Sequence, residues 1–331
     1  MAISDKVERK RNNRHLVWDN HACMPLRPAD LSYLGQLEDV RASGVDAITL
    51  NVGFGDQGIE EHVRMIATFR SWIAEHNDKM ILALTANDIL KAKSEGKLAI
   101  SFDIEGMNAL GGQTSMVEVY YALGVRWMLV AYNLANIAGG GCMEEDNGLT
   151  PFGKAALAEM NRVGMVPCGT HCGYRTARDL IEYSTTPVIF SHSNPRAVWD
   201  HPRNIPDDLM KACANRGGVI GINGIGIFLG ENDARIETIV NHIDYALSLV
   251  GEDYVGLALD YVFDDQEVAE FAAQNPAMFP PSAGFGSEMA MVGPWQITEI
   301  AECLSKRGLS DSGLGKVLGG NHLRIAETIW L

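Results

Sequence analysis

Five residues that could bind a metal ion or move a proton occupy the same kind of position in this sequence. His21, Glu105, His171, His192 and Asp260 each fall at or just after the end of a short apolar run that reads as a β-strand. Imidazole nitrogens and carboxylate oxygens are common ligands of divalent transition metals, and a free carboxylate beside such an ion can move protons. If these strand ends converge in the fold, they predict a metal-dependent hydrolytic site.

The segment around His21 supplies further donors. It reads V-W-D-N-H-A-C-M-P over residues 17–25, so Asp19, His21 and Cys23 are spaced two apart. In extended backbone, residues two apart point to the same side, and His21 and Cys23 could therefore reach one cation. An H-x-C triplet is common by chance, and its weight comes from the histidines and carboxylates at later strand ends.

The apolar runs predict eight strands that are mostly separated by helical segments. The expected strands are 16–18, 45–52, 98–104, 127–132, 165–170, 187–191, 218–223 and 254–259. Strict alternation of strands and helices implies parallel pairing, and eight such units favour an α/β fold of the (β/α)₈ TIM-barrel type. An open doubly wound sheet is disfavoured because no G-x-G-x-x-G follows the first strand. We expect one domain over residues 1–331, with long irregular loops near 133–151 and 263–294 that are candidate lids or subunit contacts.

Composition and charge narrow the function classes. The 331 residues carry a formal net charge of −15, which argues against a nucleic-acid partner because phosphates require a basic surface. No apolar run approaches the roughly 18 residues that span a membrane. The basic start lacks the apolar core of a signal peptide, and six scattered cysteines indicate free thiols, so we expect a cytoplasmic protein.

Each candidate residue also has a purely structural interpretation. A histidine near a strand end is more often a hydrogen-bonding loop residue than a ligand. Glu105 and Asp260 could cap the helices that follow them, and Cys23 could be a small buried apolar side chain. These interpretations require five coincidences at once. The set as a whole therefore favours a metal site on one face of a barrel.

Longer motifs make the pattern more specific. They are I-E-G at 104–106, G-L-T-P-F-G at 148–153, P-V-I-F-S-H-S-N at 187–194, H-P-R-N-I-P-D-D at 201–208 and G-N-H-L-R-I at 320–325. With these motifs the chain resembles the zinc-dependent membrane (renal) dipeptidases over nearly its whole length. The resemblance implies a small-molecule substrate, one or two zinc ions and a homodimer. It also implies metal ligation by His21, His171 and His192, with Glu105 bridging two ions, while Arg203 holds the substrate carboxylate and Asp260 protonates the leaving amine.

Three departures from the family pattern affect these expectations. The family usually has H-x-D at the first strand, where this chain has His21 and Cys23, and a thiolate is a softer zinc ligand. At the end of the fourth strand the family usually has a histidine, and this chain has Tyr132 and Asn133 there. We expect these two residues to contact the substrate. Tyr132 can donate a hydrogen bond to an oxyanion. After the eighth strand, D-F-D-G is replaced by D-Y-V-F-D over residues 260–264.

Three hypotheses follow. The first is a metallohydrolase that cleaves the amide bond of a dipeptide or dipeptide-like compound through a water activated by zinc, with Cys23 joining the metal ligands. The second keeps this chemistry but acts on another N-acyl or N-methylated amino-acid derivative. The third is a catalytically degenerate barrel that binds a small carboxylate-bearing molecule, which the replacements at Cys23 and Tyr132 motivate.

Overall fold

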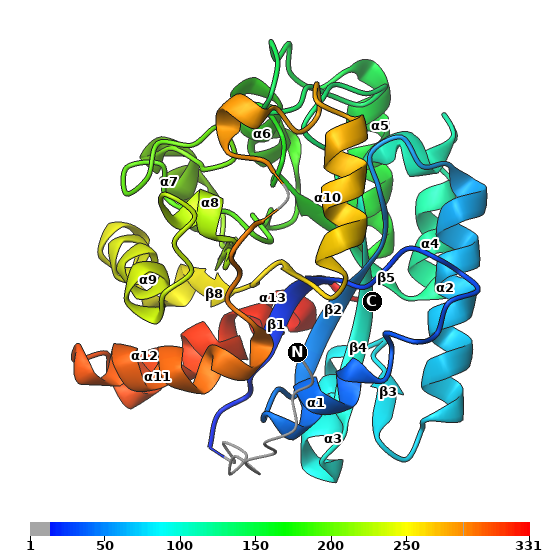
Figure 1. Ribbon diagram of the computed structural model, residues 1–331. Coiled ribbons are helices and arrows are strands. Elements are labelled where there is room, and N and C mark those ends of the chain that lie inside the picture. The colour runs from blue at the N-terminus through cyan, green and yellow to red at the C-terminus, as the bar shows by residue number, and fades with distance from the viewer. Residues whose placement is uncertain (1–13, 287) are drawn as a thin grey trace.

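The computed structural model describes residues 14–286 and 288–331 and has the expected barrel architecture (Figure 1). Seven strands form one parallel sheet and two form a second. The strands are β1 (Trp18–Cys23), β2 (Ala47–Phe54), β3 (Met80–Leu82), β4 (Leu98–Glu105), β5 (Val125–Leu129), β6 (Val166–Cys168), β7 (Ile220–Ile222), β8 (Val255–Leu257) and β9 (Tyr261–Val262). The prediction of a (β/α)₈ barrel is therefore confirmed.

The two sheets are joined into a ring by a segment that the strand pattern predicted at 187–191. Ile189 forms a bridge with Cys168 at the end of β6, and Phe190 forms one with Ile220 of β7. On the other side, β9 pairs with β1, and the backbone amide of Asp260 donates to the carbonyl of His21. The strand order around the ring is β1, β2, β4, β5, β6, the 189–190 segment, β7, then β8 with β9. The carboxyl ends of these strands consequently meet on one face.

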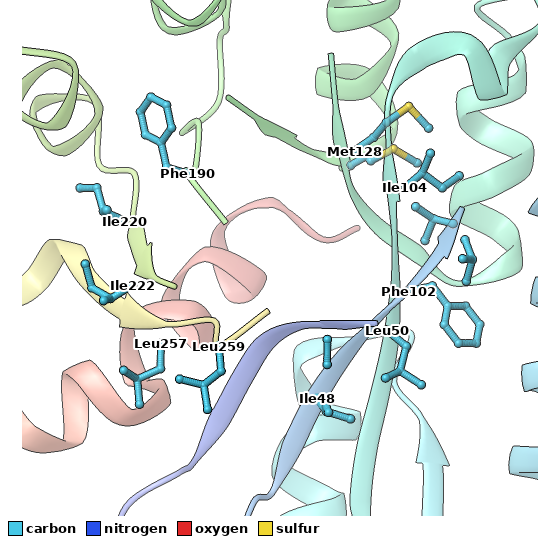
Figure 2. Close-up of a cluster of buried hydrophobic side chains, with 14 of the residues drawn as sticks. Ile48, Leu50, Phe102, Ile104, Met128, Phe190, Ile220, Ile222, Leu257 and Leu259 are labelled. Carbon is cyan, nitrogen blue, oxygen red and sulfur yellow. The ribbon is translucent and has the colours of Figure 1, made fainter. Parts of the chain in front are cut away.

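Alternation along the strands separates an apolar exterior from a polar interior. Figure 2 shows the apolar side chains that pack between the strands and the surrounding helices, among them Ile48, Leu50, Phe102, Ile104, Met128, Phe190, Ile220, Ile222, Leu257 and Leu259. The residues between them on β2 and β4 are polar and buried, and Thr49 Oγ1 lies 2.9 Å from Ser101 Oγ. Buried polar side chains of this kind need hydrogen-bond partners, and here neighbouring polar side chains of the interior supply them.

Helices cover the outside of the ring (Figure 1). The α-helices are α1 (Gln36–Ala42), α2 (Ile59–Glu75), α3 (Ala86–Glu95), α4 (Met116–Leu123), α5 (Pro151–Val163), α6 (Tyr174–Tyr183), α7 (Asp207–Asn215), α8 (Gly226–Leu229), α9 (Ile236–Val250), α10 (Asp265–Gln274), α11 (Ile297–Lys306), α12 (Asp311–Gly315) and α13 (Asn321–Ile329). Several ends carry the expected local signals. Thr150 caps α5 and accepts from the amide of Gly153, and Gly164 ends that helix in the left-handed conformation.

Some predicted boundaries were wrong. The first strand was placed at 16–18, but β1 runs from Trp18 to Cys23 and includes Asp19 and His21. Polar residues are tolerated there because they point into the polar interior, where Asp19 Oδ1 accepts from the amide of Leu259. The short edge strand β3 was not predicted, since three residues give no alternation to detect.

The two long loops differ from each other. The segment 133–151 is irregular up to the start of α5, as predicted. The segment 263–294 contains α10, which the sequence analysis had included in an irregular loop; only Ala272 of this helix is buried. The N-terminal end of the barrel is covered by α13, whose Ala326 packs with Trp18, Ala47 and Ala99.

Two further sequence expectations can be compared with the structure. All six cysteines are unpaired, as expected. Within the described residues, no helix has both the length and the apolar character that crossing a membrane requires. Most of the basic N-terminal segment, residues 1–13, lies outside the described part of the chain.

Candidate metal centre

Three imidazoles from other strand ends converge on one buried carboxylate oxygen. Glu105 Oε1, at the end of β4, lies 3.2 Å from His192 Nε2, 3.4 Å from His171 Nε2 and 3.6 Å from His21 Nε2. The two nitrogens of His171 and His192 are 3.0 Å apart. Glu105 Oε1 makes no hydrogen bond within the described structure, and its side chain is 3% exposed. Three imidazole nitrogens and an unpaired buried oxygen that face one point form the donor set of a transition-metal site.

Each imidazole is oriented by an acceptor on its other nitrogen. His171 Nδ1 donates to Asn133 Oδ1 at 2.7 Å, and His192 Nδ1 lies 2.9 Å from Ser191 Oγ. With the proton held on Nδ1 of His171, the lone pair on its Nε2 faces Glu105. This is the usual arrangement behind metal-bound histidines. The structure therefore places Asn133 behind a candidate ligand, at the cavity wall.

His21 is oriented by a residue that the sequence reasoning missed. Its Nδ1 lies 2.9 Å from Asp103 Oδ2, and both side chains are fully buried. Asp103 precedes Glu105 by two residues on β4, so the two carboxylates share the inward face of the strand. The signal was present in the sequence as D-I-E at 103–105, since a buried acidic residue two positions before a ligand predicts a partner for that site.

Asp260 and Cys23 lie on the opposite side of His21 from Asp103. Asp260 Oδ1 is 3.3 Å from His21 Nε2, and Cys23 Sγ is 3.5 Å from the same nitrogen and 3.8 Å from Asp260 Oδ1. Asn223 Nδ2 donates to Asp260 Oδ2 at 2.7 Å, which leaves Oδ1 directed at the site. His21, Cys23 and Asp260 thus form a second group of donors beside the group of His21, Glu105 and His192.

The backbone at these strand ends is unusual. Asn133, His171 and Asp260 have φ values of 55°, 62° and 59°, in the left-handed region that non-glycine residues rarely adopt. Backbone strain of this kind is maintained where surrounding contacts hold a side chain in a required direction. Here it turns three site residues toward the mouth of the barrel.

The electrostatics of the site are compatible with a bound cation. Burial raises the pKa of Glu105 to about 8 despite the opposing effect of His21, and Asp103 and Asp260 raise it further. Burial also raises the pKa of the Cys23 thiol to about 12, although His21 lowers it. Clustered buried carboxylates are costly unless a positive charge compensates them. A divalent ion between the histidines and Glu105 would supply that charge, so the residues present fit a metal.

Arg203 and Tyr132 border the centre. Arg203 is 3% exposed, its Nη2 lies 3.4 Å from the carbonyl oxygen of His192, and its Nε has no partner within the described structure. Tyr132 stacks on His171 with ring centroids 4.1 Å apart. Burial raises the pKa of Tyr132 well above its usual range, and Glu105 adds to this effect, so its hydroxyl remains a neutral donor.

A barrel whose strand ends gather three histidines and a carboxylate has the architecture of the class of metal-binding (β/α)₈ barrels. Within that class, the chain belongs to the membrane dipeptidase family (peptidase family M19), whose model matches residues 36–273. The matched region contains Glu105, His171, His192 and Asp260, while His21 and Cys23 precede it.

Individual relatives agree with this assignment. A protein of Schizosaccharomyces pombe described as an uncharacterized dipeptidase is 30% identical over 215 residues, which are 61% of this chain and 51% of that protein. A protein of Claviceps purpurea described as a dipeptidase is 27% identical over 259 residues, 77% of this chain and 56% of the relative. The chain thus spans about half the length of these curated relatives.

One solved structure matches along nearly its whole length. The crystal structure of an amidohydrolase from Pseudomonas aeruginosa is 29% identical to this chain and superimposes with a TM-score of 0.86. The match covers 96% of this chain and 97% of that one. The fold of this chain is therefore present in another protein over nearly the full extent of both chains.

Proposed function

We propose that this chain is a metal-dependent hydrolase that cleaves the amide bond of a dipeptide or a dipeptide-like small molecule. The observation that carries the proposal is the unpaired Glu105 Oε1, which lies 3.2–3.6 Å from three imidazole nitrogens. Family membership and two relatives described as dipeptidases support the choice of an amide substrate. The degenerate-barrel alternative is not favoured, because the donor set, Arg203 and Asp260 are all retained around one point.

We further propose that the metal is zinc, bound as one or two ions by His21, Cys23, Glu105, His171 and His192. Imidazole, thiolate and carboxylate together are a typical zinc ligand set. When bound, the ion supplies Lewis acidity, which polarises the amide carbonyl and makes a water molecule more acidic. Glu105, whose carboxylate has two oxygens, is the residue that could serve two ions if two are bound.

The remaining residues have separate roles in this proposal. Asp260 Oδ1 accepts the proton from the attacking water and delivers it to the amine as the amide bond breaks. Asn223 keeps Asp260 in place through its hydrogen bond to Oδ2. Arg203 binds the substrate carboxylate, since its guanidinium is buried and retains unused donors. Tyr132 donates its hydroxyl proton as a hydrogen bond to the developing oxyanion.

Asp260→Asn tests this proposal. Zinc-loaded wild-type protein should release free amino acids from members of a dipeptide panel. The variant should lose activity by 10²-fold or more, the usual contribution of a general acid–base residue, while it retains its zinc. Asp265→Asn, an exposed acidic residue on α10, is the matched control and should keep full activity. A zinc-loaded wild type that is inert toward the whole panel would contradict the proposal.

The cytoplasmic location and the homodimer that were predicted from the sequence stay predictions.

A further inference from the structure

A cavity of about 160 Å³ opens directly onto the metal centre. Its floor contains Glu105, His171, Asp260 and Cys23, which are the groups proposed to act on the amide bond. Its walls are mainly apolar, and their aromatic residues come from the end of β2, from the loop after β5, from α8, from α10 and from the loop that follows it. The aromatic wall residues are Phe54, Tyr132, Phe228, Phe271, Phe279 and Phe285.

Four of these side chains form a closed ring of contacts. Phe54 contacts Tyr132 and Phe271 with centroid distances of 5.1 and 5.0 Å. Phe279 completes the ring, at 5.8 Å from Phe271 and 6.0 Å from Tyr132. Since Tyr132 also stacks on His171, the aromatic wall begins at a candidate metal ligand. Any group that extends from the reacting carbonyl into this cavity is surrounded by aromatic faces.

The charged residues are distributed unequally around the centre. The described lining of the aromatic cavity contains no lysine or arginine, and its ionisable groups besides His171 and Tyr132 are Cys23, Glu105, Asp260 and Glu267. A second cavity, of about 340 Å³, meets the first at His171, and its charged lining residues are three arginines, Arg175, Arg196 and Arg203, and two acidic residues, Glu144 and Asp146. The site thus has an apolar side without cationic side chains and a cationic side that includes the proposed carboxylate-binding residue.

The unequal distribution of cationic side chains around the centre suggests how a substrate is oriented in the site. We propose that the substrate places its carboxylate toward Arg203 and a bulky apolar side chain, aromatic or branched aliphatic, in the aromatic cavity. That side chain belongs to the acyl half, the half that carries the carbonyl under attack. The inference rests on the proposed function and specifies its substrate class. A small side chain would leave the cavity unfilled, and an acidic one would be placed among apolar wall residues and near Glu267, with no lysine or arginine in the described lining to pair with it.

Hydrolysis of a matched dipeptide series tests this orientation. The series keeps alanine, in its L and D forms, as the leaving residue and varies the first residue among Phe, Leu, Ala and Asp. Since each buried methylene contributes about tenfold or more to discrimination in an apolar pocket, kcat/KM for Phe and Leu should exceed that for Ala at least tenfold, and Asp should be the poorest.

Variants locate the origin of the preference. Phe271 is half-buried on α10, and alanine is compatible with that helix, so Phe271→Ala should fold. It should reduce the ratio of Phe-Ala to Ala-Ala turnover at least threefold, and Phe271→Leu should restore part of that ratio. Phe152→Ala is the matched control, because Phe152 lies in the first turn of α5 outside the cavity lining; it should keep the wild-type ratio.

The outcomes separate this inference from the proposed function. Turnover of all four dipeptides at similar rates would overturn the apolar specificity and leave amide hydrolysis intact. A preference for the Asp dipeptide would also overturn it. If the zinc-loaded protein cleaves none of them, the proposed function and this inference both fail.

Discussion

Asp103 Oδ2 lies 2.9 Å from His21 Nδ1, and neither side chain has measurable exposure to solvent. The contact joins β4 to β1 across the interior of the barrel, 82 residues apart in sequence. Because β4 also carries Glu105, a single strand supplies both a candidate ligand and the group that orients another. The geometry of the centre therefore depends on the register of β4 within the barrel, and not only on the ligands themselves.

Replacing Asp103 should weaken metal binding without removing a ligand. We expect Asp103→Ala to lower the affinity for zinc by about 10- to 100-fold, because carboxylates behind metal-bound histidines fix the tautomer and the ring orientation. Asp103→Asn keeps an acceptor for His21 and should have a smaller effect. Competition with a chromogenic chelator measures both. Asp78→Ala, an exposed replacement before β3, is the control, and unchanged affinity in Asp103→Ala would contradict the account.

Cys23 should act as a ligand despite the family's preference for an acid at this position. Cys23→Ala should reduce the zinc affinity or the number of bound ions, because it removes one donor from the group that includes His21 and Asp260. Cys23→Asp should restore binding. Cobalt substitution gives an independent measurement, since thiolate ligation adds a charge-transfer band that Cys23→Ala would lack. Cys303→Ala provides the matched thiol control, and an identical spectrum in Cys23→Ala would exclude coordination by Cys23.

Any side chain at Gly141 should destabilise the fold, because this residue packs against the backbone of Asn133, the residue that orients His171. A methyl group at Gly141 would overlap the carbonyl group of Asn133, whose side chain accepts from His171 Nδ1. We expect Gly141→Ala to destabilise the fold by about 1–3 kcal/mol and to lower activity. Gly35→Ala meets no atom within 4 Å and should change stability by less than about 0.5 kcal/mol. Urea unfolding measures both, and equal stability of the two variants would show that the loop adjusts.

His322 should make stability depend on pH. Burial lowers its pKa to about 4, although its hydrogen bond to the carbonyl of Leu257 opposes the shift. The unfolded chain binds a proton on this imidazole near its ordinary pKa of 6.5, so stability rises with pH from about 4 to 6.5 and is lost on acidification. On lowering the pH from 7.5 to 5, the loss from this residue is about 2 kcal/mol.

His322→Gln tests this dependence, because glutamine can still donate to Leu257 without titrating. Unfolding free energies of the wild type and the variant, measured at pH 7.5 and 5 in the presence of a chelator, should differ in their pH dependence. The variant should lose less stability on acidification. Parallel losses in the two proteins would show that His322 does not contribute.

The structure brings together the candidate site residues that were selected from the sequence, whereas some of the residues that orient them were not selected. His21, Glu105, His171, His192 and Asp260 were found because each follows an apolar run, and parallel strands in alternation with helices bring such positions to one face. Asp103 was missed although D-I-E at 103–105 contains it, because its contact with His21 joins residues 82 positions apart. The role of Asn223 likewise depends on a tertiary contact, with Asp260, whereas Ser191 contacts the adjacent His192.

The dependence on tertiary contacts also explains the errors in the predicted strands and helices. β1 extends to Cys23 because the closed interior satisfies its polar residues, a condition that a local pattern cannot reveal. The helix α10 was missed since its apolar face packs on the aromatic wall of the cavity. Phe271 belongs to this wall through its ring contacts with Phe54 and Phe279, which the sequence does not reveal. The spacing of apolar residues predicts strands and helices well where they pack on the hydrophobic core. It predicts them poorly where they line the candidate metal centre and its cavity.

The most direct test of the central claim is the metal content of wild type and Glu105→Gln, measured by elemental mass spectrometry on protein purified without chelator. The account predicts one or two zinc ions per chain in the wild type and less than about a tenth of that in the variant, since glutamine removes the charge at the point where three imidazoles converge. Glu270→Gln, an exposed replacement on α10, should match the wild type. A wild type that holds no metal after reconstitution, or a variant that retains it fully, would contradict the account.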